Sequence, residues 1–359
     1  MKILYAIQGT GNGHLSRARD IIPILQKKGE LDILVSGIQA DVELPFDIRY
    51  RFNGLSFIFG KRGGISMTAT YRKSDLKRLA REIESLPIHE YDLILNDFEP
   101  VSAWACKLAG KPCIGLSHQA AVISKASPKP SGKDPVGKAI LHRYAPVSAS
   151  YGFHFERYDE NTFTPVIRSQ IREAVPTDKG HYTVYLPSYS DKRIIKVLSE
   201  VEDVKWQVFS KHSKKPYTAG NIDIKPVNNE AFIESFVSST GVLCGAGFEA
   251  PAEALFLKKK LMVIPMKGQY EQQCNAAAAA QLGVPVIKKL RKRYLDTILD
   301  WVESEQTITV DYPDNTEQII NEILVKHYPE PPAEGPLVQA SYKLLKKQLL
   351  DKLIRKITT

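Results

Sequence analysis

Short apolar runs rich in β-branched residues alternate, in the first half of the chain, with segments whose apolar residues recur at helical spacing. The runs predict strands at residues 2–8, 32–37, 47–53, 92–97, 112–118 and 151–156, and the periodic segments predict helices at 14–28, 74–85 and 100–109. Within the first of these helices, Pro23 predicts a kink or a broken turn, because proline lacks the N–H that a helix interior requires.

The same alternation returns after a break near residues 172–181. Strands are predicted at 181–187, 205–210, 222–227, 241–244, 260–265 and 284–288, and helices at 191–201, 229–238, 248–257 and 271–282. Strands that alternate with helices form parallel sheets covered by helices on both faces. We therefore expect an α/β protein with two doubly wound domains, at residues 1–172 and 178–328, facing a central cleft.

The end of the chain, residues 329–359, has a different pattern. A proline-rich stretch, "YPEPPAEGP", predicts a linker, and residues 337–357 form a basic amphipathic helix by their periodicity. Such a helix packs onto a neighbouring domain or lies on an anionic membrane surface. The sequence leaves both interpretations open.

Composition adds a bias toward acidic partners. The 359 residues carry a net charge of +9, which favours phosphates, nucleotides, anionic lipids or nucleic acid, although the charge could serve solubility alone. No helix-turn-helix, zinc or RNA-binding motif is present, so we expect no nucleic-acid partner.

The cysteines and the apolar stretches bear on the compartment. Cys106, Cys113, Cys244 and Cys274 form no C-x-x-C pair and are expected to be reduced and mostly buried. The sequence shows neither a signal peptide nor an apolar stretch near the ~20 residues that span a bilayer. We expect a cytoplasmic protein and leave open peripheral contact with the inner face of the membrane.

A glycine loop, "GTGNGH" from Gly9 to His14, follows the first predicted strand and opens the first helix. Backbone N–H groups and the helix dipole make such a turn suitable for anions. A dinucleotide site needs G-x-G-x-x-G and a carboxylate ending the second strand, which here ends "VSG". A P-loop is excluded, because Gly13 is followed by His14 and not by Lys. A purely structural turn stays possible.

A second glycine turn lies at residues 244–276, "CGAGFEAPAEALFLKKKLMVIPMKGQYEQQCNA". Gly245 and Gly247 end a strand before a helix that carries Glu253 in its second turn. A phosphate suits that helix start, and a carboxylate nearby suits ribose hydroxyls. Glu271 and Gln272, at the start of the next helix, can bond to sugar hydroxyls.

These two motifs resemble those of the GT-B nucleotide-sugar glycosyltransferases, over most of residues 1–330. "GTGNGHLSRA" is similar to the N-terminal glycine–histidine loop of the lipid II N-acetylglucosaminyltransferase and of the UDP-glucosyl- and glucuronosyltransferases. "GAGFEAPAEAL" with "VIPMKGQYEQQCNA" is similar to their donor-binding motif. The resemblance implies two Rossmann-like domains, an N-terminal one for the acceptor and a C-terminal one for the nucleotide sugar.

The resemblance also implies a donor site in the C-terminal domain. Gly245, Ala246 and Gly247 would approach the diphosphate, with Ser188 adding a contact, and Glu253 would bind the ribose. Glu271 and Gln272 would hold the transferred sugar, Asn275 would support their loop, and residues Val227 to Phe232 would lie at the base pocket.

On the acceptor side, the resemblance makes His14 the general base and Asp97 the carboxylate that orients it. The alternatives are that His14 only bonds the turn and that Asp97 caps the following helix. His118 and Gln119 match an acceptor-side motif of the lipid II enzyme, in which glutamate stands at the position of His118, so the identity of the base stays open. Gly9, Gly11, Asn12 and Gly13 complete the acceptor side.

The expected activity is an inverting, metal-independent transfer of a hexosyl group from a nucleoside-diphosphate sugar, with UDP favoured, to a hydroxyl acceptor. Retaining members usually carry E-x7-E, but the residue eight before Glu253 is Gly245. "DFE" at 97–99 resembles a metal motif and is discounted, because members of this fold typically need no metal or other cofactor.

The basic segment 60–81 suggests an anionic lipid or a polysaccharide precursor as acceptor, or is simply a solvated face. A nucleotide-sugar 2-epimerase of the same fold and a non-catalytic nucleotide-sugar-binding protein are the alternatives.

Overall fold

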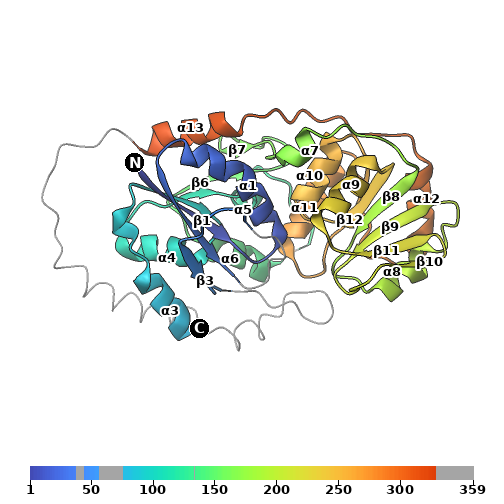
Figure 1. Ribbon diagram of the computed structural model, residues 1–359, viewed down its shortest axis with the longest axis horizontal. Helices are drawn as coiled ribbons and strands as arrows, with labels where there is room; N and C mark the ends of the chain where they lie inside the picture. The colour runs from blue at the N-terminus through green and yellow to red at the C-terminus, as the bar shows by residue number, and fades with distance from the viewer. Residues whose placement is uncertain (38–43, 56–75, 133, 329–359) are drawn as a thin grey trace, which may run out of the picture.

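The computed structural model describes residues 1–37, 44–55, 76–132 and 134–328, which form two α/β units side by side (Figure 1). The predicted α/β fold class is confirmed, since each unit contains a wholly or mostly parallel sheet with helices packed on it. The C-terminal segment 329–359 and most of the basic segment 60–81 lie outside the described residues.

The first sheet has seven parallel strands in the order β3-β2-β1-β4-β5-β6-β7. Its strands are β1 (Lys2–Gln8), β2 (Glu30–Ser36), β3 (Tyr50–Phe52), β4 (Leu93–Asp97), β5 (Ile114–Leu116), β6 (Ala149–Phe153) and β7 (Thr162–Phe163). The order reverses between β1 and β4, and loops at the carboxyl ends of strands on either side of such a point form a crevice.

The helices of this unit are α1 (Asn12–Gln26), α3 (Leu76–Ser85), the 3₁₀ turn η1 (Ile88–Glu90), α4 (Pro100–Ala109), α5 (His118–Ile123), α6 (Pro135–Arg143) and α7 (Ser169–Arg172). The apolar face expected for α1 is buried. The helix is not broken at Pro23, which lies on its exposed side near the C-terminal end.

Within the described residues, the second sheet has the strand order β10-β11-β9-β8-β12-β13, in which only the β10–β11 pair is antiparallel. Its strands are β8 (His181–Tyr185), β9 (Lys205–Ser210), β10 (Tyr217–Ala219), β11 (Ile222–Pro226), β12 (Gly241–Gly245) and β13 (Lys260–Ile264). The strand predicted at 284–288 is reduced to a single bridge between Val286 and Val263, because Pro285 has no N–H for a ladder.

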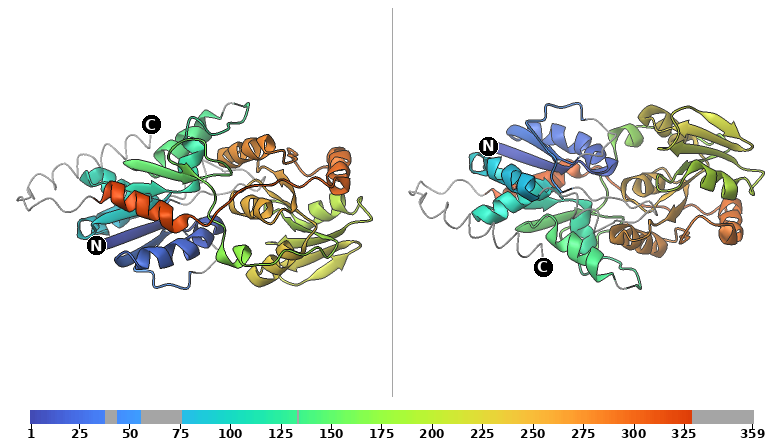
Figure 2. Two further views of the ribbon diagram at one scale, coloured as in Figure 1. Left: turned by 90° about the horizontal axis from the view of Figure 1, so that it is seen from above. Right: turned by 90° about the horizontal axis from the view of Figure 1, so that it is seen from below.

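The remaining helices are α8 (Asp191–Leu198), α9 (Asn229–Ser238), α10 (Glu249–Phe256), α11 (Tyr270–Gln281), the 3₁₀ turn η2 (Lys292–Tyr294), α12 (Leu295–Glu303) and α13 (Thr316–His327). The sequence put α13 in the second domain, but it packs on the first unit, across α1 (Figure 2). Its buried isoleucines belong to a core shared with α1, and the ring of its last residue, His327, bonds the Tyr151 hydroxyl of β6 at 2.7 Å.

The two units share apolar contacts. Phe153 and Phe155, at the end of β6, belong to the same buried cluster as Phe248 and Ala276 of the second unit. The rings of Phe155 and Phe248 lie 5.4 Å apart. This contact brings the β1–α1 turn of the first unit close to the start of α10.

Candidate functional site

A cluster of hydrogen-bonded polar side chains lies near the carboxyl ends of β1 and β4. His14 is the third residue of α1, and Asp97 is the last residue of β4, which pairs with β1 in the sheet. The His14 Nδ1 atom lies 2.8 Å from Asp97 Oδ1. Because a carboxylate only accepts, Nδ1 carries the proton and Nε2 carries the lone pair. Nε2 lies 3.3 Å from the amide nitrogen of Gln119.

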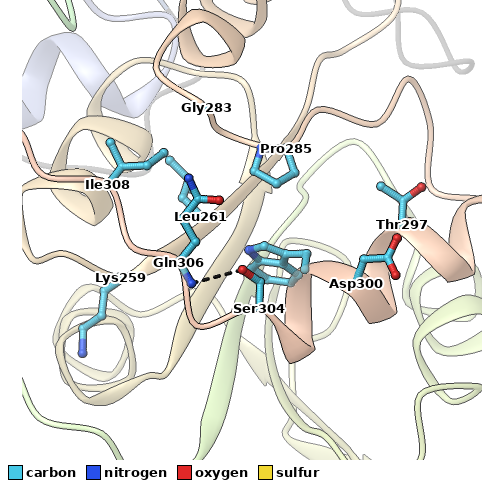
Figure 3. Close-up of a pocket in the computed structure, with 10 residues that line it drawn as sticks. Lys259, Leu261, Gly283, Pro285, Thr297, Asp300, Ser304, Gln306 and Ile308 are labelled. Carbon is cyan, nitrogen blue, oxygen red and sulfur yellow. Dashed lines mark hydrogen bonds between the residues drawn. The ribbon is translucent and has the colours of Figure 1, made fainter.

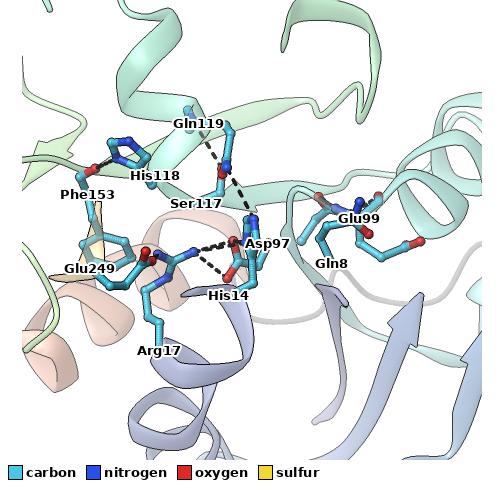
Figure 4. A network of polar contacts seen from close by, with 12 residues as sticks. Gln8, His14, Arg17, Asp97, Glu99, Ser117, His118, Gln119, Phe153 and Glu249 are labelled. Carbon is cyan, nitrogen blue, oxygen red and sulfur yellow. Dashed lines mark hydrogen bonds and ion pairs between the residues drawn. The ribbon is translucent and has the colours of Figure 1, made fainter. Parts of the chain in front are cut away.

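Arg17 completes this cluster, one helical turn after His14 (Figure 4). Its guanidinium donates to both oxygens of Asp97 at 2.7 Å and to Glu249 of the second unit at 2.6 Å. Burial alone would raise the pKa of Asp97, but the charge of Arg17 and the hydrogen bonds from His14 and Arg17 outweigh it and hold that pKa below its usual value. Asp97 is therefore a buried carboxylate that stays ionised.

The helix-capping role considered for Asp97 belongs instead to Glu99. The Glu99 carboxylate accepts from the backbone N–H groups of Val101 and Ser102 at the start of α4, and from the hydroxyls of Ser36 and Ser102. Asp97 and Glu99 therefore serve different partners. No group of three or more metal-ligating side chains is gathered in the described ranges.

A cavity of about 300 Å³ opens beside His14, between the two units. The first unit contributes β1, the glycine loop, α5 and α6, and the second contributes the start of α11. The lining residues are Gln8, Thr10, His14, Phe98, Gln119, Asp134, Val136, Gly137, Ile140, Leu141, Gly268, Gln269, Tyr270 and Glu271. Among these described residues are two carboxylates and neither lysine nor arginine, so the cavity wall is acidic apart from His14.

The second glycine turn lies at the carboxyl end of β12, next to β8 at the reversal point of the second sheet. A side chain at Gly247 would meet no described atom within 4 Å, so its backbone is open to close approach. Helix α10 begins without a side-chain cap, and so does α1. Uncapped helix starts leave N–H groups free to bind an anion.

Polar side chains of α11 support this turn. The Asn275 amide donates to the Ala246 carbonyl at 3.2 Å, and the Gln272 side chain accepts from Met266 N at 2.8 Å. The Glu271 carboxylate accepts from Gln119 at 3.0 Å, across the cavity from its own unit. Gln119 therefore lies between Glu271 and His14.

Glu253 differs from the expectation. Its carboxylate is buried and is held by Arg168 through two contacts, at 2.5 and 2.7 Å. Arg168 lies just before α7, in the segment that joins the units. Both carboxylate oxygens therefore have a charged partner inside the protein, and a ribose would have to share or displace it.

His118 also departs from the expectation, because it does not line the cavity. Its ring is buried and stacks on Phe248 of the second unit, with ring centroids 3.9 Å apart. Its two nitrogens lie 2.8 Å from the Phe153 carbonyl and 2.8 Å from the Asn275 side-chain oxygen. Burial lowers the pKa of His118 below its usual value. The ring therefore joins the two units and is not open to an acceptor.

Of the other predicted donor residues, Ser188 and Val227 follow strands, and Phe232 lies within a helix. Ser188 is exposed in the turn after β8, and Val227 is exposed after β11. The ring of Phe232 in α9 packs against Phe209 and Phe236, with centroids 5.3 and 5.2 Å apart. Phe232 is therefore chiefly a packing residue.

The glycines of the first loop have separate structural reasons. Gly11 precedes α1 with φ of 103°, a conformation that favours glycine. At Gly13 a side chain would collide with the Glu249 carboxylate, so the glycine allows the second unit to approach. Gly9 donates to the Ser36 carbonyl at 2.6 Å, and Asn12 is the first residue of α1.

A further cavity, of about 220 Å³, lies at the other end of the second unit (Figure 3). Lys259 and Leu261, at the start of β13, line it together with residues of α12 and of the segment after it. Ligands of open α/β sheets bind outside the carboxyl ends of strands, so we do not place a substrate here. No helix in the described part of the chain is both long and apolar enough to cross a membrane.

Sequence reasoning missed Arg17, Glu249 and Arg168 as parts of the site. Arg17 could have been noticed, because it falls next to Ala18 on the face of α1 that carries buried apolar residues. A charged residue on such a face usually has a buried partner. Its partner Glu249 lies 232 positions away, and nothing in the local pattern connects the two.

Comparison with known proteins places these features in a family. The family model described as glycosyl transferase family 1 matches residues 1–303. No curated protein sequence matches the chain. Among solved structures, a UDP-glucosyltransferase from Polygonum tinctorium capable of glucosylating indoxyl is similar, with 14% identity, 98% of each chain covered and a TM-score of 0.57.

Two other plant structures are similar. UGT2 of Phytolacca americana, complexed with UDP-2-fluoro-glucose and pterostilbene, has 11% identity, 98% coverage of each chain and a TM-score of 0.56. UGT89C1 of Arabidopsis thaliana, complexed with UDP, has 14% identity, covers 98% of this chain and 99% of its own, and has a TM-score of 0.55. At these identities the similarity concerns the fold, which is the GT-B arrangement.

Proposed function

The chain belongs to glycosyl transferase family 1, and on that premise we propose that it transfers a hexosyl group from a nucleoside-diphosphate sugar, UDP being favoured, to a hydroxyl acceptor. The observation that carries the proposal is the His14–Asp97 hydrogen bond beside a cavity between the two units. The similarity of the fold to glycosyltransferases solved with UDP supports the donor class.

His14 acts as the general base. With Nδ1 bonded to Asp97, Nε2 faces Gln119 and takes the proton of the acceptor hydroxyl as its oxygen attacks the anomeric carbon of the donor. Asp97 fixes the tautomer and stabilises the imidazolium that forms. The bond between the anomeric carbon and the diphosphate breaks in the same step, and its electron pair leaves with the diphosphate.

The leaving diphosphate is bound by the start of α10. The open backbone at Gly247 and the uncapped first turn of α10 support this assignment, because N–H groups and the helix dipole stabilise developing negative charge. Glu271 binds hydroxyls of the transferred sugar, next to Gln119 and His14. We propose that these groups suffice without a metal ion.

The part of the acceptor that enters the cavity is uncharged and rich in hydroxyls. Among the described lining residues there are carboxylates at Asp134 and Glu271 and neither lysine nor arginine, which disfavours an anion there. The side-chain oxygens of Gln8, Gln119 and Gln269 are buried and meet no donor in the described structure, so acceptor hydroxyls could satisfy them. Any anionic group of a lipid or polysaccharide precursor would then lie outside this cavity.

The stereochemical outcome tests the proposal. A single displacement by the acceptor inverts the anomeric configuration, so an α-linked donor yields a β-linked product. The full chain is incubated with UDP-, TDP- and GDP-sugars and a panel of saccharide acceptors in EDTA, and the first product is analysed by proton NMR.

The expected product is a glycoside of inverted configuration, formed in the presence of the chelator. A glycoside that retains the donor configuration would contradict single displacement, and loss of turnover in EDTA would contradict metal independence. Conversion of the donor to its 2-epimer without transfer would replace the proposal by the epimerase alternative.

A further inference from the structure

Arg17 occupies a position between the base and the second unit. Its side chain is 1% exposed, and its Cζ atom lies 5.8 Å from the centre of the Phe153 ring. One nitrogen, Nη2, bonds both Asp97 oxygens, and the other, Nη1, bonds Glu249, the first residue of α10. A single guanidinium therefore contacts the carboxylate that orients His14 and the helix that begins at the donor turn.

The contact with the second unit depends on the glycine loop. A side chain at Gly13 would occupy the space of the Glu249 carboxylate, so glycine at this position lets α10 reach Arg17. Gly13 directly precedes His14. The loop that carries the base is therefore also the place where the second unit touches the network.

Two opposite charges lie close to the His14 ring. The Asp97 carboxylate accepts from His14 Nδ1, and the Arg17 guanidinium donates to the same carboxylate. Among the described residues, other ionisable groups that face this network are Glu249 from α10, Glu271 from α11 through Gln119, His118 from α5, and the buried hydroxyl of Tyr5 from β1. Without Arg17, Asp97 would act on the imidazole unopposed.

We propose that Arg17 is a positioning residue for the transfer reaction: it fixes Asp97 against His14 and joins this pair to Glu249 of the second unit. The inference rests on the proposed function. Its first test uses no substrate, so that a failure of the Arg17 inference can be distinguished from a failure of the proposed function.

The first test is a proton NMR titration of the full chain, in which the His14 ring signal is assigned by its loss in His14→Gln. In Arg17→Gln the His14 titration midpoint is expected to rise above that of the wild type, because a positive neighbour has been removed. Arg17→Lys keeps the charge and should shift the midpoint less. Arg168→Gln is the matched control, since it breaks a buried arginine–glutamate contact that does not touch Asp97.

The second test measures kcat and KM against pH. The acid limb of the kcat profile is expected to move upward in Arg17→Gln in parallel with the NMR midpoint, while Glu249→Gln lowers kcat with a smaller shift of the limb. Arg17→Lys should restore part of kcat. Circular dichroism and thermal melting establish that each variant is folded. If the Arg17→Gln protein is not folded, the comparison rests on Arg17→Lys and Glu249→Gln.

An unchanged His14 midpoint in a folded Arg17→Gln protein would overturn the proposal, because a purely structural arginine affects stability and not titration. An equal shift in Arg168→Gln would overturn it as well. A shifted midpoint in a protein that transfers no sugar would support the geometry of the network and refute the proposed function alone. Where only Arg17→Lys and Glu249→Gln fold, wild-type kcat in both would overturn the proposal.

Discussion

His14→Ala is expected to lower kcat by about 10²- to 10⁴-fold, the range that a positioned general base contributes. The side chain is 12% exposed and contacts Asp97 and Gln119, so its loss removes the proton acceptor without opening the core. Donor affinity should change little, because the α10 start and Glu271 belong to the other unit. Initial rates at saturating substrates and a calorimetric donor titration measure the two effects separately.

The matched control is His89→Ala, at an exposed position in η1 before the amino end of β4. It should keep wild-type kcat. A folded His14→Ala protein with wild-type kcat would show that another group takes the proton. Of the described residues that line the cavity, Glu271 would then be examined next.

Asp97→Asn is expected to affect both catalysis and stability. An asparagine amide can donate to Nδ1, which would place the imidazole proton on Nε2 and leave the base unable to accept, so kcat should fall about as far as in His14→Ala. The free energy of unfolding should fall by about 3 kcal/mol at pH 7, because Arg17 loses the fully buried one of its two carboxylate partners. Urea unfolding and initial rates measure the two effects.

The stability difference between wild type and Asp97→Asn should depend on pH. The pKa of Asp97 is lower in the folded protein than its usual value, so its contribution is present above the unfolded pKa of about 3.9. That contribution is lost as the pH falls through the folded-state pKa. Urea unfolding from pH 7 down to pH 3 should show the two proteins converging at the acid end.

The matched control for stability is Glu317→Gln, which removes the exposed carboxylate paired with Lys28. It should change the free energy of unfolding much less than Asp97→Asn does, since surface pairs contribute little. If Asp97→Asn were no more destabilising than this control at pH 7, the buried network would not have the electrostatic role described above.

Much of the fold could be predicted from the periodicity of apolar residues, because their spacing in each strand or helix reflects which of its faces is buried. The alternation of β1, α1 and β2 is visible in residues 2–37, and it recurs at β8, α8 and β9. The placement of α13 could not be predicted, because its isoleucine face suits either unit and only packing against α1 decides. The β-propensity of residues 284–288 likewise predicts a strand, whereas the structure has a single bridge at Val286.

The parts of the candidate site that lie near a glycine turn or a strand end could be predicted from the sequence. The contacts between the two units could not. His14, Asp97 and Gly247 follow strands, and the carboxyl ends of parallel strands gather at one edge. Arg168 bonds the carboxylate of Glu253, which is 85 positions away in the sequence, and Phe248 of the other unit stacks on His118. Such pairings depend on how the units dock, for which the local sequence carries no periodic signal.

The most direct test of the proposed function is a calorimetric titration of the full chain with UDP, TDP, GDP and NAD(H), repeated with Glu271→Ala and the donor sugar. Selective binding of one nucleoside diphosphate is expected, with the corresponding nucleotide sugar bound more weakly by Glu271→Ala. Binding of NAD(H) alone, or of no nucleotide, would contradict a nucleotide-sugar site at the start of α10 and with it the assignment of a glycosyl donor.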